Sequence, residues 1–256
     1  IAQPNLDPYE KFESLTQAEQ TDRLLGLFSA AMTASPDSSR RCLLIAPETF
    51  TSDIVLQDIE SSPTVRRFRE FLSAHPGSEM LFGASTTEFF STAAPPDILA
   101  RHYGNGWYIN RNTAFLLQTG SPAQMYHKSR LVVGVELTPY PRIFVPLDDW
   151  LSRKMGVSSL MGRCKGQDEV SVLTMQDGTA LGCAVCYESI YGEYCTGYVN
   201  AGAEAMAVIT NDAWWGDTPG YKQHLNYSRL RAIELRRDFA RCGNNTRATP
   251  TVSTTV

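Results

Sequence analysis

The amino-acid sequence predicts an α/β fold in a single domain, and two observations carry that prediction. Short apolar runs typical of buried strands alternate along the chain with segments whose apolar residues recur at helical spacing. With 256 residues, 43% of them hydrophobic, the chain can bury a large core and fits one domain of generous size. We therefore expect residues 1–256 to form one domain.

Helices are expected where apolar spacing coincides with a start signal. In the first, Thr16 and Glu19 are placed as a capping pair ahead of a run of leucines. The second begins at Ser62 and Pro63, because proline is favoured in the first turn of a helix. The expected helices are 15–33, 63–72, 189–200 and 221–237.

Strands are expected where short apolar runs end at turn residues. Two pairs of runs are separated by turns, one at 119–122 with Gly120 and Pro122, the other at 176–178 with Gly178. Each such pair predicts a hairpin. The expected strands are 42–46, 80–85, 107–118, 125–127, 170–175, 179–183 and 205–210.

Composition excludes several classes of partner. The chain has 23 basic and 27 acidic residues and a net charge of −4, which gives no electrostatic reason to expect binding to nucleic acid or to an anionic membrane surface. No run approaches the roughly 18 apolar residues that a membrane-spanning helix needs. The N-terminus has no basic region ahead of an apolar stretch. We expect the chain as given to be soluble.

Cys186 is the first candidate for chemistry. It ends the apolar run 181–185 and precedes a polar segment that is expected to start a helix. The free N–H groups at a helix N-terminus favour a thiolate, so this placement suits a nucleophile. The alternative is a buried core cysteine, since free cysteine is among the most buried residue types.

Two further charged residues also follow apolar segments. Glu48 comes after 43–47, and Lys128 follows the predicted strand 125–127. Alone, each is equally well explained as a solvated surface charge. In this order and in these settings, Glu48, Lys128 and Cys186 resemble the Glu-Lys-Cys triad of the nitrilase (carbon-nitrogen hydrolase) superfamily.

Within that superfamily the sequence resembles the apolipoprotein N-acyltransferases, bacterial membrane enzymes that add the third acyl chain to lipoproteins. The likeness spans nearly the whole chain, but Arg247 stands where glycine is expected and 248–256 do not align. It is carried by residues 2–5, which resemble the family's first strand, Glu136 eight positions after Lys128, and the segments 186–188, 211–218, 223–224, 229–234 and 242–246.

The resemblance implies a four-layer αββα sandwich and a place in a larger protein. Family members carry transmembrane helices on both sides of the catalytic domain, so we expect this chain to be a fragment that lacks them, with the last strands missing or altered. It further implies the periplasmic face of the bacterial inner membrane. It also implies a single-chain enzyme attached to the membrane through segments absent here.

Roles follow from residue chemistry and from the resemblance. Glu48 is the expected general base for the thiol of Cys186. Lys128 is expected to stabilise the oxyanion together with the backbone N–H of Tyr187 or Glu188.

The resemblance adds Glu136 and Glu188 as supporting carboxylates, for which salt bridges to Arg130, Arg142 or Arg231 are the structural alternative. Asn112 resembles a family asparagine near the active site, and strand-edge hydrogen bonding is its alternative. Trp214 and Trp215 are expected either on a loop over the pocket, where they would meet an acyl chain, or as core anchors.

No metal or cofactor is expected. Cys183 and Cys186 form a C-x-x-C, but no second such pair completes a zinc site. The other four cysteines, 42, 164, 195 and 242, are predicted to be buried thiols or disulfides. A Cys-His protease would have only His127 or His224 to use.

The function that this resemblance implies is acyl transfer from a phospholipid, through a Cys186 thioester, to the N-terminal amine of a diacylated lipoprotein. A nitrilase-type amidase acting on a small non-peptide C–N bond would use the same three residues and let water resolve the acyl-enzyme. A catalytically inactive lipoprotein-binding domain is the third hypothesis. The enzymes differ in acceptor, and the binding domain differs from both in forming no acyl-enzyme.

Overall fold

Two β-sheets form the centre of the protein, as a computed structural model describes it for residues 1–6, 15–34, 41–157, 159–216, 218–244 and 251–253. The first sheet has six strands in the order β1-β3-β5-β4, with β2 paired to β3 and β6 paired to β5. Its strands are β1 (Cys42–Ile45), β2 (Thr51–Val55), β3 (Ser78–Phe90), β4 (Arg101–Tyr103), β5 (Gly106–Leu117) and β6 (Gln124–His127).

The second sheet has five strands in the order β11-β10-β9-β8-β7. Strands β8, β9 and β10 are parallel, so their carboxyl ends share one edge of the sheet. The five are β7 (Leu173–Thr174), β8 (Ala180–Val185), β9 (Ala205–Thr210), β10 (Asp238–Gly243) and β11 (Thr251–Ser253).

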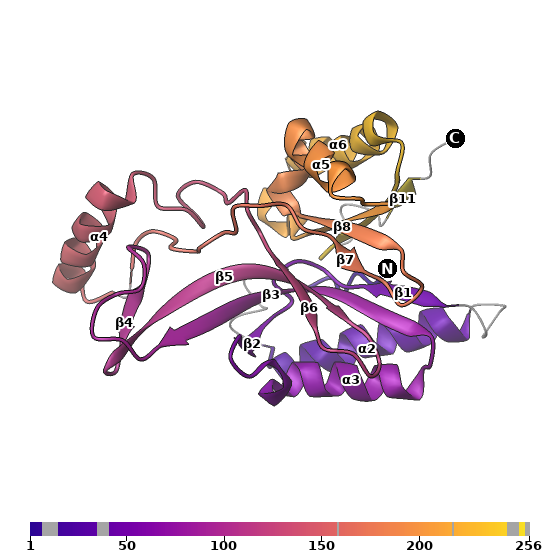
Figure 1. Cartoon of the computed structure of the whole chain (residues 1–256), viewed down its shortest axis with the longest axis horizontal. Coiled ribbons are helices and arrows are strands. Elements are labelled where there is room, and N and C mark those ends of the chain that lie inside the picture. Colours follow the sequence, from indigo (N-terminus) through magenta and orange to yellow (C-terminus); the bar gives the residue numbers. More distant parts are fainter. Residues whose placement is uncertain (7–14, 35–40, 158, 217, 245–250, 254–256) are drawn as a thin grey trace.

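Helices cover the outer face of each sheet, which completes the four-layer αββα sandwich that the resemblance implied (Figure 1). Helices α2 (Gln17–Thr33) and α3 (Pro63–Ala74) cover the first sheet, and α5 (Gly192–Asn200) and α6 (Gly220–Leu235) cover the second. Helix α4 (Pro141–Met155) lies apart, beyond the distal ends of β3 and β5. Three short 3-10 helices are η1 (Ile59–Ser61), η2 (Cys186–Ile190) and η3 (Asp212–Trp215).

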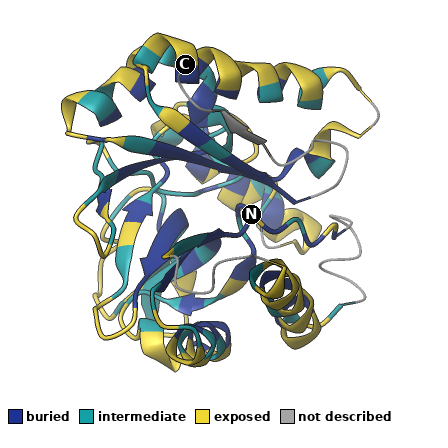
Figure 2. Cartoon of the chain, turned by 90° about the vertical axis from the view of Figure 1, so that its right-hand side faces the viewer, coloured by how far each residue is buried: buried dark blue, intermediate teal, exposed yellow. Residues whose placement is uncertain are grey.

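The core follows the two-residue period of the strands. In β3, Met80 and Phe82 pack with the helices α2 and α3, while Leu81 between them belongs to the cluster that joins the two sheets. Figure 2 shows the buried sheets between helices whose outer surfaces are exposed. The predicted caps are present, since Thr16 and Glu19 form a capping box on α2 and the Ser62 side chain caps α3.

Several expectations about elements were wrong. Residues 2–5 form no strand, although Ala2 N–H donates to Ile45 O at 3.0 Å. Helix α6 ends at Leu235 because Arg236 adopts a left-handed conformation, and strand β10 starts three residues later. Strands β2 and β4 and helix α4 were not predicted. The C-terminal expectations fall largely on residues 245–250 and 254–256, which lie outside the described residues.

Candidate active site

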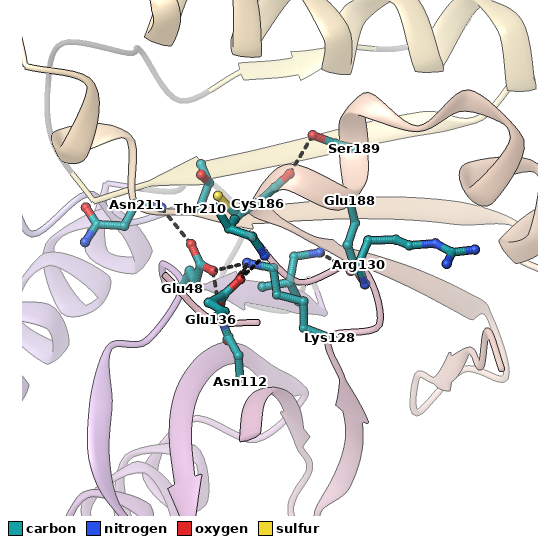
Figure 3. A network of polar contacts seen from close by, with 12 residues as sticks. Glu48, Asn112, Lys128, Arg130, Glu136, Cys186, Glu188, Ser189, Thr210 and Asn211 are labelled. Atoms are coloured by element: carbon teal, nitrogen blue, oxygen red, sulfur yellow. Dashed lines mark hydrogen bonds and ion pairs between the residues drawn. The ribbon is translucent and has the colours of Figure 1, made fainter. Parts of the chain in front are cut away.

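The ends of three strands meet at one cavity (Figure 3). Glu48 lies just beyond β1, Lys128 directly follows β6, and Cys186 directly follows β8. All three line a cavity of about 630 Å³ between the sheets. The structure therefore brings together Glu48, Lys128 and Cys186, which are 80 and 58 residues apart in sequence.

Glu48 can enter this cavity because β3 passes unusually close to it. A Cβ added at Gly83 would lie 2.6 Å from the Glu48 Cα, a separation that real Cβ atoms do not adopt. The backbone N–H of Gly83 donates to Pro47 O at 3.1 Å, and that of Phe50 donates to Gly83 O at 2.8 Å. Gly83 thus fixes the Glu48 turn against the sheet without a side chain in the way.

Lys128 is the centre of a buried charge network. Its Nζ lies 3.0 Å from Glu48 Oε1 and 2.8 Å from Glu136 Oε2, and its side chain is 1% exposed. Burial alone would lower the pKa of Lys128, but the negative charge of Glu48, and the charge and hydrogen bond of Glu136, outweigh it and hold this pKa well above its usual value. Lys128 is therefore a fixed cation at any physiological pH.

Asn112 bridges the carboxylates of Glu48 and Glu136. Its Nδ2 donates to Glu48 Oε1 at 2.8 Å and to Glu136 Oε1 at 2.7 Å. Asn112 is 4% exposed and belongs to the interior strand β5, so the strand-edge alternative does not describe it. Glu136 also accepts from the backbone N–H of Val132 at 2.9 Å. Its two carboxylate oxygens therefore accept from three groups, those of Asn112, Lys128 and Val132.

Glu136 and Glu188 form no salt bridge with the arginines that were considered as alternatives. Glu188 is fully buried and its Oε1 accepts from the Tyr126 hydroxyl at 2.7 Å and from the backbone N–H of Ser129 and Arg130 at 2.6 and 3.1 Å. Its Oε2 accepts from Val185 N–H at 2.7 Å. Burial raises the pKa of Glu188 despite these donors. The side chain ties the Lys128 loop to the turn that carries Cys186.

Cys186 occupies a strained turn. Its φ of 52° is the left-handed region, which costs a residue other than glycine about 1–3 kcal/mol. The expected thiolate is not what this environment favours. Burial, then the Glu48 carboxylate, raise the pKa of Cys186 to about 12, and the nearby Lys128 charge and a hydrogen bond with Thr210 only partly offset them. The resting nucleophile is a thiol beside a base.

The aromatic candidates separate in the structure. Trp214 lines the cavity and is 61% exposed, and Trp215, 40% exposed, packs over Gly220 outside the cavity lining. Neither is a core anchor. The Tyr187 ring stacks edge-on against Tyr191 and is not part of the lining, so only its backbone remains a candidate for the site.

Sequence reasoning missed one donor to the base. The backbone N–H of Asn211 donates to Glu48 Oε2 at 3.2 Å, which leaves Glu48 with hydrogen bonds on both oxygens (Figure 3). Asn211 is the first residue of the segment 211–218, which carries part of the resemblance, and Thr210 directly precedes it. Within that segment, only the tryptophans were assigned to the site. The position just after strand β9, at the same sheet edge as Cys186, was the available signal.

Metal and redox chemistry have no assembled site in the described part of the chain. No group of three His, Cys, Asp or Glu side chains there is placed to hold a metal ion. All six cysteines lie in described segments and none of them forms a disulfide there, so the disulfide alternative does not apply to this structure. Among the described helices, none has the length and apolar character to cross a bilayer.

The sequence is similar to those of known proteins over nearly all of its length. The apolipoprotein N-acyltransferase of Chlorobaculum tepidum is 31% identical over 95% of this chain and 45% of its own length. That of Allorhizobium ampelinum is 27% identical over 96% of the chain and 42% of its own length. The chain thus spans less than half the length of these curated relatives.

Solved structures share the fold at low identity. A Saccharomyces cerevisiae member of branch 10 of the nitrilase superfamily superposes with a TM-score of 0.61 at 13% identity, over 94% of this chain and 78% of its own. A carbon-nitrogen hydrolase from Helicobacter pylori gives 0.55 at 13% identity, over 89% and 68%. The profile of the carbon-nitrogen hydrolase family matches residues 17–250. The chain therefore belongs to the carbon-nitrogen hydrolase family.

Proposed function

We propose that this protein transfers a fatty acyl chain from a phospholipid to the N-terminal amine of a diacylated lipoprotein, through a thioester at Cys186. The observation that carries the proposal is the convergence of a thiol, a carboxylate and a fixed ammonium on one cavity. The relatives named apolipoprotein N-acyltransferase, which match 95% of the chain, support this acceptor and this bond.

The first half-reaction forms the thioester. Glu48 takes the Cys186 proton as the sulfur attacks the ester carbonyl of the phospholipid. The carbonyl oxygen becomes an oxyanion, stabilised by Lys128 and the backbone N–H after Cys186. Collapse of this intermediate expels the lysophospholipid alkoxide, which receives the proton back from Glu48. A resting thiol with a pKa near 12 makes this base necessary.

The second half-reaction transfers the acyl group. The lipoprotein amine attacks the thioester carbonyl, Glu48 accepts a proton from the nitrogen, and the Cys186 thiolate leaves and recovers a proton. An amide forms and a thioester breaks, with no external oxidant or reductant. When Glu48 is protonated, Lys128 keeps Glu136 as a charged partner, and Asn112 donates to the same carboxylate.

The walls of the cavity support a lipid substrate. Beside charged and uncharged polar residues, the lining includes five apolar side chains from several elements: Leu15, Phe50, Val132, Val135 and Trp214. Val135 and Trp214 are 75% and 61% exposed, so two of these apolar side chains also face solvent. An acyl chain can lie against these side chains while its carbonyl reaches Cys186.

The exposed apolar side chains of helix α4 support the proposal that the lipid comes from a membrane. This helix continues from the loop that supplies Val132 and Val135, and lies at one end of the molecule (Figure 1). Ile143, Leu147 and Trp150 follow one another at helical spacing, and they are 65%, 48% and 56% exposed. An apolar face beside Arg153 and Lys154 suits the interface of a bilayer. We propose that the protein acts as a single chain at the periplasmic face of the bacterial inner membrane.

The test follows the acyl group to its acceptor. The protein is incubated with phosphatidylethanolamine in detergent, together with a diacylglyceryl-cysteine peptide or the same peptide acetylated on its amine. Triacylated peptide from the free amine alone supports the proposal. Release of free fatty acid without peptide acylation would show that water resolves the acyl-enzyme, and turnover of small amides without peptide acylation would instead identify an amidase. Peptide binding without either product would identify a binding domain.

A further inference from the structure

A second buried polar network lies behind the nucleophile. It consists of His224 on α6, Asp212 on η3, Arg241 on β10 and Ser189 on η2. His224 is 2% exposed, and Asp212 and Arg241 are each 1% exposed. None of the four lines the cavity. The catalytic steps above use none of them, so this network needs its own account.

Asp212 and Arg241 fix the orientation of the imidazole. His224 Nδ1 lies 2.9 Å from Asp212 Oδ1, and Asp212 Oδ2 pairs with the Arg241 guanidinium. Burial opposes ionisation of Asp212, but the hydrogen bond from His224 and the charge of Arg241 hold its pKa below the usual value. The Asp212 carboxylate and the Arg241 guanidinium, whose Nη2 lies 3.3 Å from His224 Nδ1, together hold the ring in place.

The other ring nitrogen reaches the backbone of the nucleophile. His224 Nε2 lies 3.0 Å from the carbonyl oxygen of Cys186 and 3.0 Å from Ser189 Oγ. Ser189 Oγ in turn donates to the same carbonyl oxygen at 2.8 Å. Because a carbonyl oxygen can only accept, Nε2 must carry a hydrogen for its contact to be a hydrogen bond. Two side chains thus hold one backbone oxygen.

The position of the Cys186 carbonyl oxygen determines the direction of the next backbone N–H, that of Tyr187. The carbonyl of Cys186 and the N–H of Tyr187 belong to one planar peptide unit, in which they point in opposite directions. Holding the oxygen toward His224 therefore aims the Tyr187 N–H to the opposite side of the turn. The same constraint keeps Cys186 at its left-handed φ of 52°, a conformation that residues other than glycine rarely hold without support.

We propose that His224 is the positioning residue of the oxyanion hole: it anchors the Cys186 carbonyl so that the Tyr187 N–H faces the oxyanion of the reacting acyl group. The inference rests on the proposed thioester chemistry at Cys186. His224 acts through the backbone and touches no substrate. Its contribution is specific to reactions of the thiol that build negative charge on an oxygen.

Two reactions of the same thiol separate this role from a general structural one. Acylation of Cys186 by p-nitrophenyl butyrate passes through an oxyanion, whereas alkylation by iodoacetamide does not. His224→Asn keeps a donor near Asp212 and loses the donor to Cys186, and His224→Gln has the length to restore that donor. We expect His224→Asn to slow acylation about 100-fold at an unchanged KM, with alkylation within about twofold of the wild-type protein, because a displaced catalytic donor costs a factor of this order.

His224→Gln should recover most of the acylation rate. Ser228→Ala is the matched control, because this buried serine lies one turn further along α6 and its hydroxyl has no hydrogen-bond partner among the described residues. It should react like the wild-type protein. Equal slowing of both reactions in His224→Asn, or a Gln variant as slow as the Asn variant, would overturn the proposal.

The same data separate this inference from the proposed function. A wild-type protein that accepts butyrate from the ester but never acylates a lipopeptide would contradict the lipid acyltransferase and still test His224. A wild-type protein whose Cys186 is alkylated but never acylated would contradict both, since no working oxyanion hole would be present.

Discussion

Replacing Lys128 by Met should destabilise the fold and disable acylation for the same reason. Methionine keeps the length of the side chain but removes the charge that lies 3.0 Å from Glu48 and 2.8 Å from Glu136. Breaking a buried ion pair by removing one partner typically costs about 3–5 kcal/mol, because the remaining charge is left uncompensated. For a chain of this size we expect the melting temperature to fall by about 6–20 °C.

Lys165→Met is the matched control for this measurement. Lys165 Nζ pairs with Asp97 at 2.6 Å, but its side chain is 38% exposed, and such exposed pairs contribute only about 0–1 kcal/mol. Thermal unfolding followed by circular dichroism at pH 7 compares the two variants. Melting temperatures within about 2 °C of each other would refute the reasoning that Lys128 holds the buried carboxylates together.

A second variant separates charge from shape. Adding Glu136→Gln to Lys128→Met removes one of the two unpaired carboxylates, so part of the lost stability should return. The acylation rate should not return, because the ammonium that faces the oxyanion is still absent. Each oxyanion donor is typically worth about 10²–10³ in rate, so both variants should be slower than the wild-type protein by at least that order.

Three further perturbations follow from the same geometry. Glu48→Gln removes the carboxylate that, after burial, contributes most to the high pKa of Cys186. Alkylation of Cys186 at pH 9, measured by peptide mass spectrometry, should therefore be faster than in the wild-type protein. Acylation at pH 7 should fall by about 10²–10⁴ because the general base is lost. Because alkylation needs the thiolate and the wild-type pKa is about 12, the wild-type rate should keep rising above pH 9, and a plateau by pH 9 would contradict this account. Gly83→Ala should cost about 1–3 kcal/mol in a denaturant titration and reduce acylation, since its Cβ would meet backbone at 2.6 Å; a variant with wild-type stability would mean that the turn moves freely. Leu147→Ser combined with Trp150→Ser should weaken co-sedimentation with phosphatidylethanolamine vesicles without changing thiol acylation by a soluble ester, and unchanged sedimentation would argue against α4 as the lipid contact.

The sequence predicted which residues form the site better than it predicted the electrostatics of that site. Glu48, Lys128 and Cys186 were found because each reactive residue follows an apolar run and because the three, in this order, resemble the nitrilase triad; strand ends are where a layered α/β fold collects such side chains. The protonation state of Cys186 was predicted wrongly. Local sequence shows the helical turn that follows the thiol, but the burial and the Glu48 carboxylate that dominate its pKa come from distant segments.

Helix α4 shows why some elements could not be predicted. It begins after Tyr140, whose φ of 42° is left-handed, it contains Pro146, and four of its large apolar side chains, Ile143, Leu147, Trp150 and Met155, are exposed. Patterns of buried spacing identify helices that pack on a core, and α4 does not. Strand β10 was missed for a different reason, because the charged residues Arg236 to Asp238 looked like the end of a helix rather than a turn into a strand.

The hydrogen-bond partners of the site were equally hidden from sequence. Asn211 supplies a backbone N–H to Glu48, and every residue type except proline has that group, so its identity carried no signal. His224 was considered as part of the resemblance and as a partner for the thiol, whereas its Nε2 contacts the carbonyl oxygen of Cys186. Contacts of this kind depend on how the sheets pack and become visible only in three dimensions.

Intact-mass spectrometry after incubation with phosphatidylethanolamine in detergent tests the central claim most directly. The account predicts a mass gain of one acyl group on the wild-type protein, absent from Cys186→Ala and discharged by a diacylglyceryl-cysteine peptide with a free amine. An unmodified wild-type mass, or an equal gain on the Cys186→Ala variant, would contradict a thioester at Cys186.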